Sequence, residues 1–143
     1  MNYEDWFEKH GEKHRRIVDK LKSNKLSRIE IVKYFDYENM VVHEPEFCFL
    51  YTDNKKCHEV EKLNCYLCAC PLFRFNDNGF YKINNKTVFS QCEVNSKHGV
   101  QGEFGEAIHL DCSRCTVPHA EKYVLKNYDD NWFAIMEDCN QGD

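Results

Sequence analysis

The chain has 143 residues and a mass of 17.1 kDa, which suits one domain with a single core. Hydrophobic residues at 42% and aromatic residues at 14% exclude general disorder, and no run approaches the roughly 18 consecutive apolar residues of a membrane helix. The formal charge of −5 gives no general attraction to nucleic acid or to an anionic membrane. Since the first residues also lack the apolar core of a secretion signal, we expect a soluble, cytoplasmic protein.

The first third of the chain predicts two helices. Asn2 is a candidate cap for a helix that ends near Ser23, and its apolar face consists of Tyr3, Trp6, Phe7, Ile17, Val18 and Leu21. Ser27 and Glu30 form a capping-box pair, which predicts a second helix from about Ser27 to Asp36. Residues 1–43 are therefore interpreted as an N-terminal helical extension.

Residues 44–143 have a different sequence pattern, because their cysteines are clustered and turn residues replace helical periodicity. Short apolar segments flank the turn signal at residues 84–86, as a hairpin requires. The polar stretch with Gly99, Gly102 and Gly105 is interpreted as a flexible connection. The segment from Tyr123 to Met136 is expected to return to the front helices as a helix or strand.

The expected fold is α+β within one compact unit. Two N-terminal helices precede a small, loop-rich cysteine domain with short hairpins, which metal ions staple together. That cysteine-rich metal-binding domain is assigned to residues 44–143.

Nine cysteines in a chain without an export signal point to metal binding, because the cytoplasm keeps thiols reduced. Two Cys-x-x-Cys units can each direct two sulfurs to one ion, at about 2.3 Å for zinc. The candidate donors are Cys57, His58, Cys65, Cys68, Cys70, Cys92, Cys112, Cys115 and His119. This set exceeds the four ligands of one zinc ion, so two centres are expected.

Several other readings of the same residues stay open. Cys48 is either a ligand or a small buried hydrophobe, and Cys139 is expected to be the latter. A redox dithiol and a catalytic cysteine paired with histidine are alternatives to metal ligation. His10 and His14 lie four residues apart, a spacing that could chelate an ion, but packed structural histidines are the favoured interpretation.

The order of these motifs resembles the cysteine-rich small domain family. The resemblance covers roughly Cys48 to Tyr123 and rests on three motifs, namely Cys57-His58, Cys65-x-x-Cys68-x-Cys70-Pro71 and Cys112-x-x-Cys115-x-x-x-His119, with Cys92 a looser match. The family is described as a metal-binding, zinc-finger-like module. Its members occur alone in anaerobic or microaerophilic bacteria and archaea, and similar domains are fused to a decarboxylase of cobalamin biosynthesis. The resemblance implies a metal centre and no particular reaction.

Three functions compete. The favoured one is a structural or accessory zinc module that engages a protein partner, a role that needs no catalytic activity but leaves open whether the protein is an enzyme. The alternative is an iron-sulfur or open-site zinc protein with a redox or enzymatic role, because Cys65, Cys68 and Cys70 followed by Pro71 also suit cluster ligation. The second alternative is nucleic-acid binding through the basic segment 13–28, although most such runs are solvated helix faces. Neither the identity of a partner nor the oligomeric state follows from the sequence.

Overall fold

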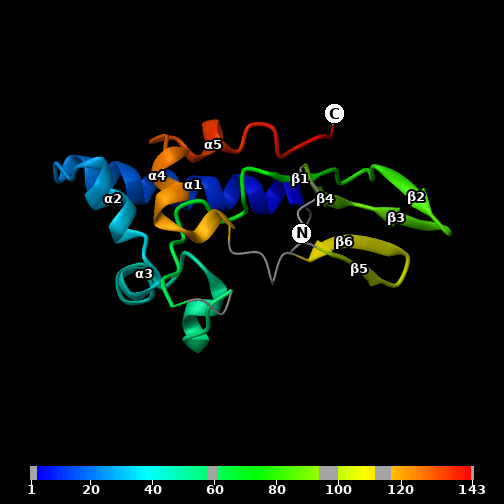
Figure 1. Ribbon diagram of the computed structural model, residues 1–143, viewed down its shortest axis with the longest axis horizontal. Helices are drawn as coiled ribbons and strands as arrows, with labels where there is room; N and C mark the ends of the chain where they lie inside the picture. The colour runs from blue at the N-terminus through cyan, green and yellow to red at the C-terminus, as the bar shows by residue number, and fades with distance from the viewer. Residues whose placement is uncertain (1–2, 58–60, 94–99, 112–116, 143) are drawn as a thin grey trace.

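The computed structural model describes residues 3–57, 61–93, 100–111 and 117–142, and these residues form an α+β fold. Figure 1 shows the helices gathered at one end of the molecule and the strands at the other, with α1 reaching from the helical end toward the strands. The helices are α1 (Tyr3–Ser23), α2 (Arg28–Tyr34), α3 (Tyr37–His43), α4 (Glu121–Lys126) and α5 (Trp132–Ile135), with 3-10 turns η1 (Phe49–Asp53) and η2 (Val117–His119). No helix among the described residues is long and apolar enough to cross a membrane.

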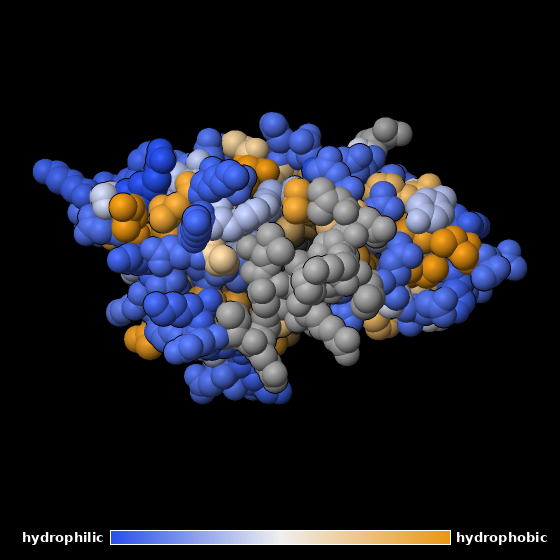
Figure 2. Space-filling model, viewed as in Figure 1, coloured by the Kyte–Doolittle hydropathy of each residue, from blue (hydrophilic) through white to orange (hydrophobic). Residues whose placement is uncertain are grey.

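The strands form two small sheets. Strands β1 (Phe73–Phe75) and β4 (Ser90–Cys92) pair antiparallel as a two-stranded sheet. The other sheet has the order β2 (Tyr81–Ile83), β3 (Lys86–Val88), β6 (Ala107–Asp111) and β5 (Val100–Phe104), with β3 parallel to β6. Its exposed large apolar side chains are Tyr81, Ile83 and Phe104. Figure 2 shows apolar surface over this end of the molecule.

Helix α1 confirms the first predicted helix, and its start is held by a distant residue. The two carboxylate oxygens of Asp77 accept hydrogen bonds from the backbone amides of Tyr3 and Glu4 at 2.9 and 3.0 Å. A carboxylate in this position satisfies amides that have no partner within the helix and complements the positive end of the helix dipole. The first turn of α1 is thereby fixed to the loop between β1 and β2.

Helix α2 begins where the capping box predicts, but it ends earlier than expected. Ser27 and Glu30 make both reciprocal hydrogen bonds of the box. The sequence predicts one helix to Asp36, whereas α2 stops at Tyr34 and α3 starts at Tyr37. The buried Asn64 side chain donates hydrogen bonds to the Val32 carbonyl at 2.6 Å and to the Asp36 carboxylate at 2.9 Å. This tertiary contact pairs the Val32 carbonyl in the last turn of α2 and favours an end of the helix there.

The predicted hairpin is confirmed in β2 and β3. Asn84 and Asn85 occupy its two-residue turn with φ values of 51° and 66°. Positive φ at both turn residues matches the right-handed twist of the flanking strands, and asparagine tolerates that conformation well.

The glycine-rich stretch is a hairpin within the described residues, so the prediction of a flexible connection is wrong there. Strands β5 and β6 pair along five residues each, and Gly105 supplies the turn with φ of 65°. The stretch is polar because both strands lie at the projecting end of the molecule, where burial does not impose apolar alternation.

One hydrophobic cluster joins the front helices to the rest of the chain. It includes Val18 from α1, Phe35 next to α2, Tyr66 and Phe75 from the middle of the chain, and Trp132 from α5. Helix α4 contacts α2, and α5 contacts α1. The expectation that the segment from Tyr123 to Met136 returns to the front helices is confirmed.

Two histidines of α1 lie inside this cluster. His10 is 5% exposed and stacks on Trp6, while His14 is fully buried and its Nε2 donates to the Tyr66 carbonyl at 2.9 Å. Burial lowers the pKa of His10 to about 4, with Lys13 adding to the shift, and lowers the pKa of His14 to about 3, with His10 adding to it. Both rings are neutral parts of the core, in agreement with the favoured interpretation.

The burial of His10 and His14 as neutral rings predicts that the protein loses stability in acid. Because the folded-state pKa values of His10 and His14 lie below the ordinary 6.5, their contribution to stability is fully present above pH 6.5. That contribution is lost as the pH falls from 6.5 toward these folded-state pKa values. His10→Phe keeps an aromatic ring in place but removes one titrating group. Between pH 7 and pH 5 the wild type should lose about 2 kcal/mol more unfolding free energy than this variant. Urea denaturation at the two pH values measures the difference, and equal losses would contradict the account.

Candidate metal centre

Cys57 and His119 meet although 62 residues separate them. The Cys57 Sγ atom lies 3.8 Å from His119 Nε2. His119 Nδ1 lies 2.7 Å from the Asn64 carbonyl oxygen, which can only accept, so Nδ1 carries the proton of the neutral ring. The lone pair of Nε2 therefore faces the sulfur. This is the tautomer in which a histidine binds a metal through Nε2 while a backbone carbonyl orients the ring.

The first Cys-x-x-Cys unit, Cys65 to Cys68, follows directly on the backbone contact with His119. The Asn64 amide donates to the His119 carbonyl at 3.0 Å, and the following Cys65 amide donates to the Phe35 carbonyl at 2.8 Å. The Cys68 amide donates to the Cys65 carbonyl at 3.2 Å, which closes the tight turn expected for this motif. The unit thus begins directly beside His119, with its position set by backbone hydrogen bonds on both sides.

Four cysteines influence one another electrostatically and form what we call the thiol group: Cys48, Cys57, Cys65 and Cys68. Burial raises the pKa of Cys65 to about 12, and the Cys57 and Cys48 thiols act in the same direction. Burial also raises the pKa of Cys68 well above its usual value, with contributions from Cys65, Cys57 and Cys48. Burial therefore favours the protonated thiols of Cys65 and Cys68 in a metal-free protein, and a bound dication would reverse that preference.

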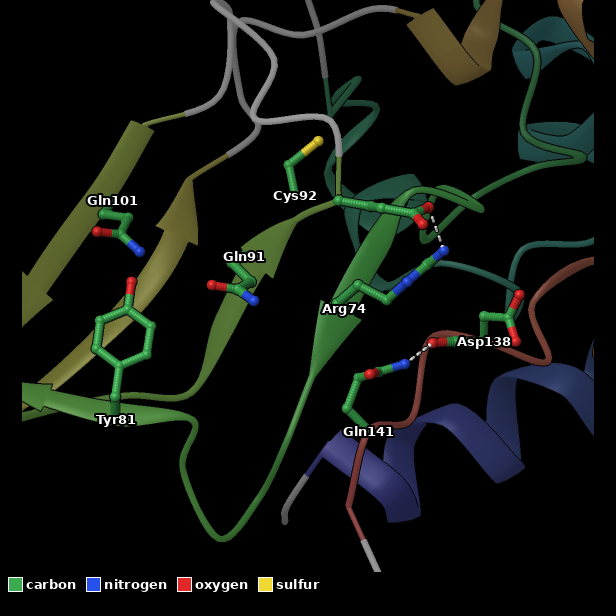
Figure 3. A pocket seen from close by; sticks show the side chains of 8 residues that line it. Arg74, Tyr81, Gln91, Cys92, Gln101, Asp138 and Gln141 are labelled. Atoms are coloured by element: carbon green, nitrogen blue, oxygen red, sulfur yellow. Dashed lines mark hydrogen bonds and ion pairs between the residues drawn. The ribbon is translucent and has the colours of Figure 1, made fainter.

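Two of the predicted donors lie in other surroundings. The Cys70 sulfur accepts a hydrogen bond from the Leu72 amide at 3.4 Å. Burial raises the pKa of the nearby Cys139 to about 12, and the Cys70 thiol adds to that shift. Cys92 lines an open polar pocket of about 690 Å³ with Arg74 and Gln91 (Figure 3). Arg74 donates to the Glu93 carboxylate at 2.5 Å in the same pocket. The ligand roles of Cys70 and Cys92 stay predictions.

His58, Cys112 and Cys115 lie outside the described residues, so their ligand roles also stay predictions. Within residues 3–57, 61–93, 100–111 and 117–142, no group of three or more His, Cys, Asp or Glu side chains is arranged to hold a metal ion. The donor pair from Cys57 and His119 and the neighbouring thiols are the features of the described residues on which a centre can be built.

Sequence reasoning left Cys48 open and did not single out Tyr37 or Tyr51. Cys48 precedes η1, and the Tyr51 amide donates to its carbonyl at 3.0 Å. Tyr37 and Tyr51 contact each other edge to face, with ring centroids 5.7 Å apart. The spacing of Cys48 and Tyr51 by three residues could have indicated that one helical turn carries both.

The basic segment of α1 is largely engaged within the protein. Arg15 pairs with Glu12, Lys20 with Glu44 and Lys22 with Asp130. The Lys13 ammonium donates to the Glu46 carbonyl at 3.0 Å. Since these contacts already occupy much of the positive charge, no geometry of the described residues favours nucleic-acid binding over a solvated helix face.

The fold and the site together define an α+β chain in which thiols and one imidazole from distant segments come together. Comparison with family models, with curated proteins and with solved structures found no significant match for this chain. The resemblance to the cysteine-rich small domain family therefore stays a prediction from its motifs.

The geometry makes Asn64 critical for stability. Its side chain donates to Val32 and Asp36 and accepts from the Tyr66 amide at 2.9 Å, all in a residue that is 1% exposed. Asn64→Ala removes these bonds and leaves buried groups unpaired, so it should lower the unfolding free energy by about 3 kcal/mol. The exposed Asn127→Ala is the control, with an expected loss of about 0.5 kcal/mol. Chemical denaturation measures both, and equal effects would contradict the role assigned to Asn64.

Proposed function

We propose that the protein is a metal-binding module in which one zinc ion is held by Cys57, His119 and the sulfurs of Cys65 and Cys68. The approach of Cys57 Sγ to His119 Nε2 carries this proposal. A tetrahedral zinc ion with bonds of about 2.3 Å to sulfur and 2.0–2.1 Å to nitrogen places these atoms about 3.6 Å apart. The separation of 3.8 Å needs only a small adjustment to match.

The remaining two ligands come from the Cys-x-x-Cys turn. Cys65 and Cys68 already interact electrostatically with Cys57, whose sulfur faces the His119 ring. The four donors are not gathered into a metal site in the described residues. Binding then requires the turn to close on the ion, with loss of the thiol protons. Cys112, Cys115 and His58 stay candidate donors for this ion or for a second one.

Such a centre has no open position, which favours a structural role. Four protein ligands fill a tetrahedral zinc site, whereas catalytic sites keep one position for water or substrate. The ion would link the segment after η1, the Cys-x-x-Cys turn and η2. Structural zinc contributes on the order of 10 kcal/mol to the folding of small modules. The function that follows is an accessory one, exerted on a protein partner through the surface that the ion holds in shape.

The same pair of side chains favours a second candidate, a thiol nucleophile with a histidine base. Cys57 is exposed, His119 Nε2 faces its sulfur, and the Asn64 carbonyl orients the ring. The two candidates predict different effects of zinc on the reactivity of Cys57. Zinc ligation predicts that one equivalent of the ion protects Cys57 from iodoacetamide, whereas rapid alkylation in the presence of bound zinc would favour the nucleophile.

Cys57→Ser tests the ligand set, because this exposed position leaves the core packing intact. The variant should lose zinc on dialysis, and a chelator should no longer lower its melting temperature, while the same chelator lowers that of the wild type. Elemental analysis and thermal melts of protein prepared without oxygen measure both effects.

Cys139→Ser is the matched control. Cys139 is 1% exposed and its thiol donates to the Cys70 carbonyl, so the variant should melt lower and still retain zinc. Full zinc content in Cys57→Ser, or a wild type without stoichiometric zinc, would reject the proposal. Coloured wild-type protein containing iron in place of zinc would favour the iron-sulfur alternative.

A further inference from the structure

The open polar pocket beside Arg74 has the size of a small-molecule site. Its volume is about 690 Å³, and pockets that hold small ligands in other proteins measure about 300–1,000 Å³. Residues of both sheets and of the segment that follows α5 line it together (Figure 3). Its walls therefore come from distant parts of the chain, which the fold brings to one place.

Arg74 presents one edge of its guanidinium to this pocket. The residue is 8% exposed, and its Nη1 donates to the Pro71 and Phe73 carbonyls at 2.7 and 3.0 Å, which fixes the plane of the group. Its Nη2 donates to one oxygen of Glu93 at 2.5 Å, and no described residue accepts a hydrogen bond from Nε. The edge formed by Nε and Nη2 can hold a carboxylate through two parallel hydrogen bonds. Glu93 uses only one of these two donors.

Glu93 shows that a carboxylate fits this position, and it is weakly held there. Its side chain is 55% exposed, whereas that of Arg74 is 10% exposed. An exposed carboxylate loses little when water replaces its ion-pair partner. The buried guanidinium, in contrast, needs an acceptor at all times. A ligand carboxylate that places both oxygens on Arg74 can therefore displace Glu93.

The other charges of the pocket determine what else the ligand must carry. Glu93 and Asp138 bring two negative charges to the pocket, against the one positive charge of Arg74. Asp138 precedes Cys139, whose sulfur lies 3.9 Å from Arg74 Nη1, so both charged side chains line the same part of the pocket. No described residue forms an ion pair with Asp138. A simple anion is repelled here, but a ligand that also carries an ammonium group gains Asp138 as its partner.

Neutral polar groups make up much of the remaining wall. The amides of Gln91 and Gln101 and the hydroxyl of Tyr81 line the pocket, and none of these three side chains has a hydrogen-bond partner among the described residues (Figure 3). Amide and hydroxyl groups both donate and accept hydrogen bonds. They suit a ligand whose remaining part is polar and uncharged.

We propose that this pocket binds a small zwitterion with a neutral polar side chain, as a free amino acid presents. The ligand carboxylate pairs with Arg74 in place of Glu93, and the ligand ammonium group pairs with Asp138. The ligand side chain contacts the amides of Gln91 and Gln101. The proposal goes beyond the zinc centre and is independent of it, because none of these side chains belongs to the four proposed zinc ligands.

Titration calorimetry of the purified chain with L-serine, L-threonine, L-asparagine and L-glutamine, each alone, tests the pocket. At least one of the four should bind. Its N-acetyl derivative and its carboxamide derivative should each bind at least about tenfold more weakly, because each lacks one of the two charges. An N-acetyl derivative that binds as well as the free amino acid would overturn the zwitterion and favour the C-terminal residue of a peptide. Absence of binding by all four would overturn the proposal.

Two exposed variants assign the charges to their residues. Glu93→Gln should bind the amino acid about threefold more tightly, because a competing carboxylate has been removed from Arg74. Asp138→Asn should bind about tenfold more weakly, because the ammonium group loses its ion-pair partner. The neighbouring Glu137→Gln is the matched control, since this exposed carboxylate does not line the pocket and its loss should leave the affinity unchanged.

Wild-type affinity in both Glu93→Gln and Asp138→Asn would overturn the assignment. Zinc content measured on the same samples distinguishes this proposal from the proposed function. A chain that binds the amino acid without holding zinc would reject the zinc centre and support the pocket, and a zinc-loaded chain that binds none of the four would do the reverse.

Discussion

The contact between Asn64 and His119 is the constraint on which the rest of the arrangement depends. The Asn64 amide donates a hydrogen bond to the His119 carbonyl. The His119 ring donates a second one to the Asn64 carbonyl. The Asn64 side chain meanwhile contacts the last turn of α2 and fixes the start of the Cys-x-x-Cys turn. One buried residue therefore joins the front helices, the first cysteine pair and η2. Because every polar atom of its side chain is hydrogen-bonded, the junction has one defined geometry.

This junction relates stability to the proposed chemistry. A protein of this size has a net stability of about 5–15 kcal/mol, and a structural zinc ion can contribute a similar amount. Backbone hydrogen bonds bring His119 and the Cys-x-x-Cys turn together before any ion is present, so an ion would find part of its site already formed. The free energy of zinc binding would be gained only as the thiols lose their protons.

Local signals predicted well those elements that local contacts determine. The capping box of Ser27 and Glu30 and the asparagine turn of the β2–β3 hairpin depend on neighbouring residues alone. The end of α2 could not be predicted, because Asn64 contacts it from elsewhere in the chain. The β5–β6 hairpin was missed because its polar strands lack apolar alternation. Cys57, Cys65, Cys68 and His119 were named as donors from their motifs. The inclusion of Cys48 in the thiol group depends on tertiary packing, which motif spacing does not encode.

The central claim is that sulfur and imidazole donors from three distant segments share one ion. X-ray absorption at the zinc edge of the purified protein tests this claim most directly, because it reports which atoms surround the metal and at what distance. The account predicts a first shell of sulfur at about 2.3 Å together with one imidazole nitrogen at about 2.0–2.1 Å. A shell of oxygen and nitrogen alone, or a protein that takes up no zinc, would contradict it.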